Sequence, residues 1–221
     1  MAYTVESILA ELRALSSQAD KQGMARSGIN VNKAYGVSIP PIRDLAKQIA
    51  RDHTLAQQLW STGVHEARLL ACLIDEPEKV TDKQMERWAR DFDSWDLCDQ
   101  VCNNLFDQTP FAYRKVTQWS ARPQEFVKRA AFSLMASLAV HDKKALDSAF
   151  EPFFPLIARE APDERNFVKK AVSWALRQIG KRNARLRKLA LQTAKEIQNT
   201  SSRSAKWVAT DALRELTAKK Q

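Results

Sequence analysis

Apolar residues recur at helical spacing along nearly the whole chain, and no segment shows the strict alternation of a half-buried strand. The first example follows Thr4, whose side chain can accept a hydrogen bond from an early helical N–H group. One face of this segment carries Val5, Ile8, Leu9, Leu12 and Leu15. The pattern predicts an all-α fold.

Further helices are predicted by the same spacing and by their start and stop signals. Pro40 and Pro41 suit a helix start because proline lacks an N–H that would be unpaired there. Gln18 to Ser38, with three glycines, is expected to be looser, and Pro152 and Pro155 are expected to interrupt a helix. Asp163 is expected to cap a helix that ends at Gly180 in a left-handed turn. The expected helices follow Thr4 and span Pro40–Ile49, Thr54–Ser61, Val64–Ile74, Thr81–Ala89, Ser94–Leu105, Phe111–Trp119, Gln124–Val140, Leu146–Arg159, Asp163–Gly180, Asn183–Ile197 and Ser202–Lys219.

A repeated segment indicates how these helices are arranged. FVKRA at Phe126 to Ala130 returns as FVKKA at Phe167 to Ala171, 41 residues later. This period is typical of stacked helical pairs, so we expect an α-α superhelix, a solenoid of about six HEAT-like pairs. No linker rich in Gly, Ser or Pro divides the chain, so one domain over residues 1–221 is expected.

Positive charge is concentrated in the second half of the chain. The net charge is +9, yet residues 121–221 hold 21 Lys+Arg against 10 Asp+Glu, whereas residues 1–120 hold 14 against 16. Cations gathered in one region are typical of nucleic-acid binding. A basic surface without a partner remains the alternative at this point.

Other function classes find little support in the sequence. No apolar run reaches the roughly 18 residues of a membrane span, and the acidic N-terminal segment is unlike a secretory signal, so a cytoplasmic location is expected. The cysteines, Cys72, Cys98 and Cys102, fit small core side chains in a reducing compartment. A metal site at Cys98 and Cys102 is disfavoured because His53, His65 and His141 lie far away in sequence.

The segment SWDLCDQV, residues 94–101, has the most suggestive chemistry. At 100° per residue, Trp95 and Asp99 fall together at the edge of an apolar arc. A partly shielded carboxylate there would act strongly on a nearby cation. Alternatively, Trp95 packs in the core and Asp99 is a solvated helix residue.

Trp174 poses the same question on the second repeated helix, since Lys170 and Arg177 lie one turn to either side of it. Cations around an aromatic ring suit contact with phosphates and a sugar or base, although such a tryptophan also packs between repeats. On the first repeated helix Arg129 is expected to project away from the core and to contact phosphate.

These segments together resemble the bacterial DNA alkylation repair glycosylases of the AlkD type. The resemblance is carried by SWDLCD at Ser94 to Asp99, FVKRAA at Phe126 to Ala131 and FVKKAVSWALRQ at Phe167 to Gln178. It implies a HEAT-like array whose concave basic face binds duplex DNA. The site residues it implies are the catalytic Asp99 with Trp95 and Trp174, and Arg129 on the DNA. The neighbouring cations Lys128, Lys169, Lys170 and Arg177 are further candidates for DNA binding.

The resemblance implies excision of N3- or N7-alkylpurines from double-stranded DNA, as a step of base excision repair. Alkylation gives the base a positive charge and weakens its glycosidic bond, so one carboxylate can stabilise the cationic sugar. The resemblance also implies excision without a pocket for a flipped base. No cofactor is implied, and a monomer is expected.

One departure from the family pattern leaves other functions open. A tyrosine often follows Met-Ala-Arg in the family and completes an aromatic cleft, whereas Ser27 follows Met24-Ala25-Arg26 here. A non-catalytic protein that binds damaged or branched DNA is therefore one alternative. A HEAT-type protein-interaction scaffold is the other, because fold alone does not determine function.

Overall fold

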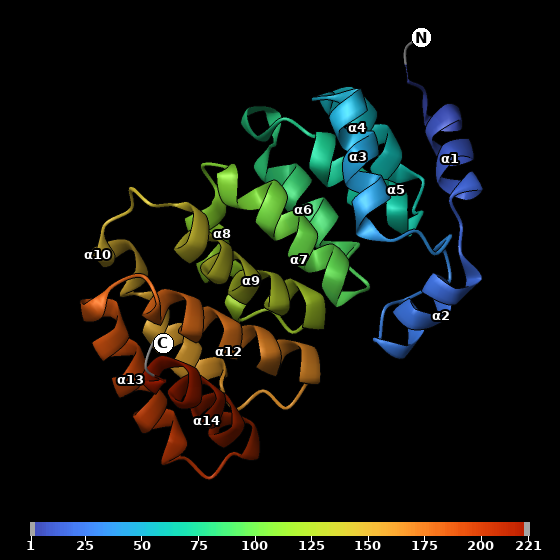
Figure 1. Ribbon diagram of the computed structural model, residues 1–221. Coiled ribbons are helices and arrows are strands. Elements are labelled where there is room, and N and C mark those ends of the chain that lie inside the picture. The colour runs from blue at the N-terminus through green and yellow to red at the C-terminus, as the bar shows by residue number, and fades with distance from the viewer. Residues whose placement is uncertain (1–2, 219–221) are drawn as a thin grey trace. The chain divides into compact units, whose positions relative to one another are not determined.

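The computed structural model describes residues 3–218, which contain fourteen α-helices, two 3-10 helices and no β-strand (Figure 1). The prediction of an all-α fold is confirmed. No helix in the described part of the chain combines the length and apolar character of a membrane span. The helices form two compact units that divide between Thr109 and Pro110. The expected single domain with a concave basic face stays a prediction.

Helix α5 lies at the centre of the first unit, where α3, α4 and α7 pack against it. Helix α1 packs against both α5 and α4. Two indole rings stack inside it, since the centroids of Trp60 and Trp88 are 3.8 Å apart. Its elements are α1 (Val5–Ala14), α2 (Gln18–Arg26), α3 (Ile39–Ile49), α4 (His53–Ser61), α5 (His65–Ile74), η1 (Pro77–Lys79), α6 (Asp82–Arg90), α7 (Trp95–Asn104) and η2 (Phe106–Gln108).

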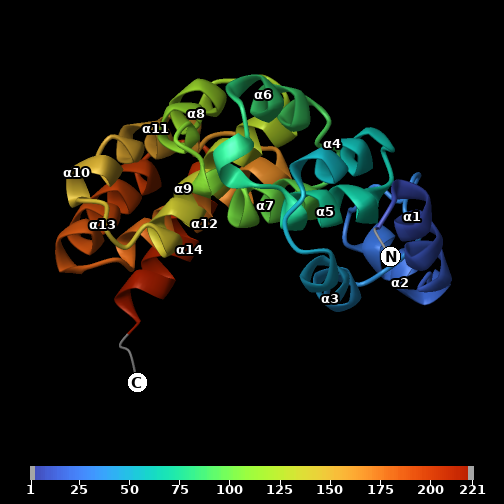
Figure 2. The same ribbon diagram turned by 90° about the horizontal axis from the view of Figure 1, so that it is seen from above.

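The second unit is built around helices α9 and α12, which lie alongside each other and form its most extensive helix–helix contact (Figure 2). Helix α8 packs on α9, and α13 and α14 pack on each other and on α12. Its elements are α8 (Ala112–Ser120), α9 (Glu125–His141), α10 (Asp147–Phe150), α11 (Phe153–Glu160), α12 (Asn166–Gly180), α13 (Ala184–Gln198) and α14 (Arg203–Thr217). The predicted end of the last helix at Lys219 lies outside the described residues.

The repeated segment stacks on its own copy, as expected for tandem helical pairs. Phe126 opens α9 and Phe167 opens α12, and their ring centroids are 5.7 Å apart. The apolar residues that follow each phenylalanine are buried, which places equivalent faces in one core.

Helix starts were predicted well where a side chain makes the cap. Thr4 accepts a hydrogen bond from Ser7 N–H, and Thr81 accepts one from Gln84 N–H. The prolines at the start of α3 were also predicted correctly. Asp163 was wrong as a cap, because α12 begins only at Asn166 and the Asp163 carboxylate binds Arg165 instead.

Two other predictions need correction. Residues 18–26 form a regular helix, α2, although this helix buries none of its own side chains. Helix α12 does end at Gly180, but that glycine has no positive φ. An added Cβ there would lie 2.9 Å from the Ala190 Cβ and 2.9 Å from a methyl of Leu216. Close packing of helices, and not a left-handed turn, therefore explains this glycine.

Candidate nucleic-acid interface

Helix α7 presents Trp95 and Asp99 at the edge of its buried face. Leu97, Cys98, Val101 and Cys102 are fully buried, whereas Trp95 and Asp99 are partly exposed. The two side chains are four residues apart and so lie one turn from each other. The predicted rim position of this pair is confirmed.

Trp95 is fixed by a hydrogen bond to a distant part of the chain. Its indole N–H donates to the backbone carbonyl of Ser27, 3.0 Å away. Ser27 is exposed and directly follows the last residue of α2. Residue 27, the position that departs from the family pattern, therefore lies beside the Trp95 indole. A larger side chain at this position would be attached next to the ring.

The loop between α2 and α3 is held against the start of α7. Asn30 N–H donates to the Ser94 hydroxyl at 2.9 Å, and the Asn30 amide donates to Asp93 at 2.9 Å. Ser94, expected from the sequence to cap this helix, makes no side-chain cap bond within α7 and accepts the Asn30 bond instead. This contact fixes where the helix carrying Trp95 begins.

The buried carboxylate of Glu66, on α5, binds the backbone of the same loop. It accepts hydrogen bonds from the backbone N–H groups of Tyr35, Gly36 and Val37, with the shortest 2.8 Å long. Glu66 is 0% exposed. These three hydrogen bonds compensate for the burial of the Glu66 oxygens. They also fix the backbone of the loop that contacts the start of α7.

His65 braces the first turn of α7 from α5. Its Nε2 atom lies 2.9 Å from Oδ2 of Asp96, and its side chain is buried. Burial alone would lower the pKa of His65, but the hydrogen bond and charge of Asp96 raise the pKa above its ordinary value. Asp96 therefore favours the protonated form of His65, and the pair connects α5 to the first turn of α7.

The cysteines have no reactive role in this arrangement. All three are free and buried, as predicted for core side chains. Burial raises the pKa of the Cys72 and Cys102 thiols, which keeps both protonated at neutral pH. Asp99, which is partly exposed, remains the candidate catalytic group on this helix.

In the second unit Trp174 lies on α12 in a partly exposed position, between buried Ser173 and Ala175. Its neighbour Arg177 lies 3.2 Å from Asp211 and also pairs with Glu215, on α14. Lys170 is exposed and has no ion-pair partner within residues 3–218. Of the two cations predicted to flank Trp174, Lys170 is thus the one available to an external anion.

Lys169 makes a contact that the sequence analysis did not predict. Its ammonium lies 5.1 Å from the ring centroid of Trp207, an α14 residue that is 40% exposed. A cation over an indole face is an attractive pair. The helical spacing of Trp207, next to the buried residues Val208 and Ala209, is the sequence signal for this edge position.

Arg129 does not project away from the core as expected. It is 5% exposed, and its guanidinium donates to the backbone carbonyl of Phe167 at the start of α12. Arg129 therefore ties the two repeated helices together. Its predicted contact with DNA phosphate stays a prediction.

Lys128 is also engaged within the second unit. Its ammonium binds Glu160 and lies 3.2 Å from Asp163. Burial opposes ionisation of Asp163, but hydrogen bonds from Arg165 and Lys128 hold its pKa at about 2. These carboxylates neutralise Lys128, which weakens the prediction that it binds phosphate.

The predicted catalytic residues are divided between the two units. Trp95 and Asp99 belong to the first unit and Trp174 to the second. Each lies partly exposed at a helix edge, which is the condition for contact with a ligand. Their meeting in one site stays a prediction.

Comparison with known proteins agrees with the resemblance drawn from the motifs. Residues 8–216 match the family described as DNA alkylation repair enzyme. No curated protein matches the chain. A solved structure, described as a new family of proteins related to the HEAT-like repeat DNA glycosylases with affinity for branched DNA structures, is 21% identical with a TM-score of 0.77. The match covers 99% of this chain and 98% of that one.

A second solved structure, a designed armadillo repeat protein in complex with the peptide (KR)4, is 13% identical with a TM-score of 0.39, covering 93% of this chain and 80% of that one. The first structure shares its fold with this chain, which confirms the predicted HEAT-like class. With 8–216 matched, the chain belongs to the DNA alkylation repair enzyme family.

Proposed function

We propose that this protein is a DNA glycosylase that releases positively charged N3- and N7-alkylpurines from duplex DNA. The observation that carries the proposal is the pairing of Asp99 with Trp95 at the exposed edge of α7. Family membership supports it, since repair of alkylated DNA requires removal or reversal of such adducts.

The chemistry follows from the charge of the lesion. Alkylation at N3 or N7 leaves the purine cationic, so the glycosidic bond breaks with the bonding electrons moving to the base. The sugar then carries positive charge, which the Asp99 carboxylate stabilises more strongly beside an apolar wall than in bulk water. Water adds to the anomeric carbon and loses a proton to complete hydrolysis.

The tryptophan faces supply a second source of stabilisation. In this proposal Trp95 and Trp174 both contact the deoxyribose, where an aromatic face attracts the developing cation. The hydrogen bond to Ser27 holds the Trp95 ring in a fixed orientation. No step requires rotation of the base into a closed pocket, so selectivity rests on lesion charge.

Backbone contacts are assigned to the cations on and near α12. Lys170 is exposed and Lys169 lies at the surface beside Trp207, so these two residues lead the assignment. Arg177 and Lys128 are paired with carboxylates and Arg129 is buried. Lys128 and Arg177 therefore offer little positive charge to a phosphate, and Arg129 joins the two repeated helices through the Phe167 carbonyl.

The test compares a charged lesion with a neutral one. Duplexes containing a single 7-methylguanine or a single uracil are incubated with the protein, and abasic sites are measured by alkaline cleavage. The proposal predicts strand breaks only at 7-methylguanine. Release of uracil at a comparable rate would contradict selection by lesion charge.

A second candidate function is DNA binding without catalysis. It is favoured by Ser27, which places no aromatic ring beside Trp95 where the family pattern often has one. The solved relative described by its affinity for branched DNA structures also supports it. Retained binding to lesion-bearing or branched DNA, with no abasic product over a long incubation, would select this function over excision.

A further inference from the structure

The second unit contains a large basic pocket that none of the predicted site residues lines. Its volume is about 920 Å³, and it lies between the end of α9, the segment 142–148, the end of α12 and the start of α13. This volume is at the upper end of the range for ligand sites and is far larger than one phosphate group requires. The pocket therefore has room for an extended ligand.

Arg182 gives the pocket a rigid base. Its guanidinium donates to the backbone carbonyls of Ala139, at 2.8 Å, and Ala145, at 3.1 Å, and its central carbon lies 4.2 Å from the ring centroid of Phe150. Asp142 closes the same segment by accepting from Ala145 N–H at 3.0 Å. These bonds fix the 142–146 segment, so the pocket is formed before any ligand arrives.

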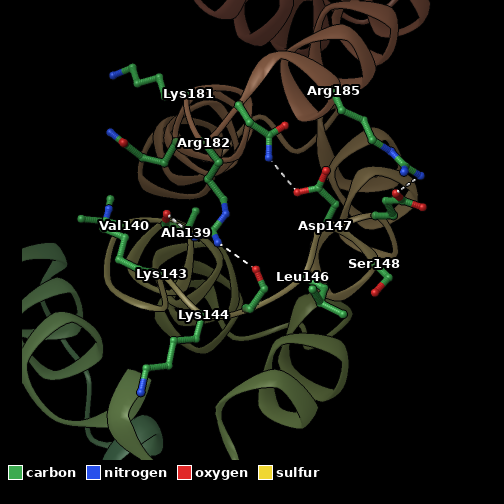
Figure 3. A pocket seen from close by; sticks show the side chains of 14 residues that line it. Ala139, Val140, Lys143, Lys144, Leu146, Asp147, Ser148, Lys181, Arg182 and Arg185 are labelled. Atoms are coloured by element: carbon green, nitrogen blue, oxygen red, sulfur yellow. Dashed lines mark hydrogen bonds and ion pairs between the residues drawn. The ribbon is translucent and has the colours of Figure 1, made fainter.

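The lining has an excess of positive charge on one side. Five cations (Lys143, Lys144, Lys181, Arg182, Arg185) face two carboxylates (Asp147, Glu151), which leaves +3. Figure 3 shows the three lysines along one side of the pocket, with Asp147 and Arg185 across from them.

The two carboxylates are already occupied by other partners. Asp147 accepts a hydrogen bond from the Asn183 amide at 2.7 Å, and Glu151 pairs with Arg185 at 2.7 Å. Lys181 is paired with Glu215. Lys143 and Lys144 are exposed, and neither has a carboxylate partner in the described part of the chain. These two ammonium groups are the ones available to an anionic ligand.

We propose that this pocket binds the phosphodiester backbone of duplex DNA, at a place that Trp95, Asp99 and Trp174 do not line. A row of lysines suits repeated phosphates, which a DNA strand presents and a small anion does not. Leu146, 75% exposed, and Val140 line the pocket beside the lysines and offer apolar contact to deoxyribose. The inference rests on the DNA binding of the proposed function and is independent of base excision.

The salt dependence of binding to undamaged duplex tests this assignment. The double variant Lys143→Gln/Lys144→Gln is compared with Lys188→Gln/Lys195→Gln, which removes the same charge from exposed positions of α13 in the same unit. Two lost phosphate contacts should flatten the log–log slope by about 1.8 units in the first variant. The control should keep the wild-type slope. Equal slopes in both double variants would overturn the proposal.

A cross-linking measurement locates the DNA directly. Ser148 is exposed and lines the pocket, so Ser148→Cys can carry a photoactivated cross-linker, and labelling is selective because the native cysteines are buried. We expect a DNA adduct that Lys143→Gln/Lys144→Gln weakens several-fold. Absence of the adduct, while wild type binds DNA, overturns the pocket assignment alone. Wild type without salt-dependent DNA affinity would also overturn the proposed function.

Discussion

At the scale of single residues, the orientation of Trp95 depends on Ser27, 68 positions earlier in the chain. The bond uses the backbone carbonyl of Ser27, so any residue at position 27 can accept it. The side chain of residue 27 is therefore free to vary while the tryptophan stays in place. An aromatic residue can therefore be introduced at position 27, where the family pattern often has tyrosine, without disturbing α7.

Replacing Ser27 with tyrosine should strengthen binding to lesion-bearing duplex. The site is exposed, so the ring meets no core atoms, and one base–aromatic contact contributes about 1–3 kcal/mol. We expect a roughly tenfold lower Kd, measured by fluorescence anisotropy. Ser27→Leu adds bulk without an aromatic face and serves as the control; equal gains from both substitutions would exclude a stacking role.

The His65–Asp96 pair should make stability depend on pH in a defined direction. The folded-state pKa of His65 is raised, so its contribution is fully present below the unfolded value near 6.5 and declines as pH rises through the folded value. The loss of unfolding free energy in His65→Gln should therefore be larger at pH 6 than at pH 9. Urea denaturation at the two pH values measures it. A larger loss at pH 9 would contradict a charged pair.

Residues whose neighbours lie in the same helix were predicted from sequence, and residues with distant partners were not. The rim position of Trp95 and Asp99 follows from helical spacing alone. Arg129 and Lys128 look equally exposed by that spacing. Their partners, however, lie 38 and 32 residues further along the chain, where no local pattern reveals them.

At the scale of helices, the sequence identified nearly every element, and the errors concern α2 and the ends of α7 and α12. Helix α2 was missed because it contains Gly23 and buries no side chain, so it lacks an apolar stripe. Glycine also misled at Gly180. Glycine is required at this position because α13 and α14 approach it closely, which depends on tertiary packing and not on the local sequence.

Two glycine substitutions should therefore change stability in opposite directions. A Cβ at Gly180 would lie 2.9 Å from Ala190 and Leu216, so Gly180→Ala should cost about 1–3 kcal/mol through overpacking. A Cβ at Gly23 meets nothing within 4 Å, and Gly23→Ala within α2 should stabilise by roughly 0.5–1 kcal/mol. Thermal and urea unfolding measure both. A stabilised Gly180→Ala would contradict the close-packing explanation.

At the scale of the whole molecule, net charge overstates the number of cations available to DNA. The chain carries +9, but several cations of the second unit are bound to carboxylates, among them Lys128, Arg165 and Arg177. The exposed remainder includes Lys170 on α12 and Lys143 with Lys144 at the pocket. DNA affinity should thus depend on a few positions and fall steeply with salt.

If the Asp99 carboxylate stabilises the sugar cation, its charge must raise the rate of base release in a single turnover. Rates are measured on a 7-methylguanine duplex with wild type, Asp99→Asn and the control Asp44→Asn, an exposed α3 residue. Asparagine keeps the shape of the side chain and removes its charge, so we expect the rate to fall about 100- to 1,000-fold for Asp99→Asn and to stay unchanged for Asp44→Asn. Release by Asp99→Asn at the wild-type rate would contradict this role of Asp99.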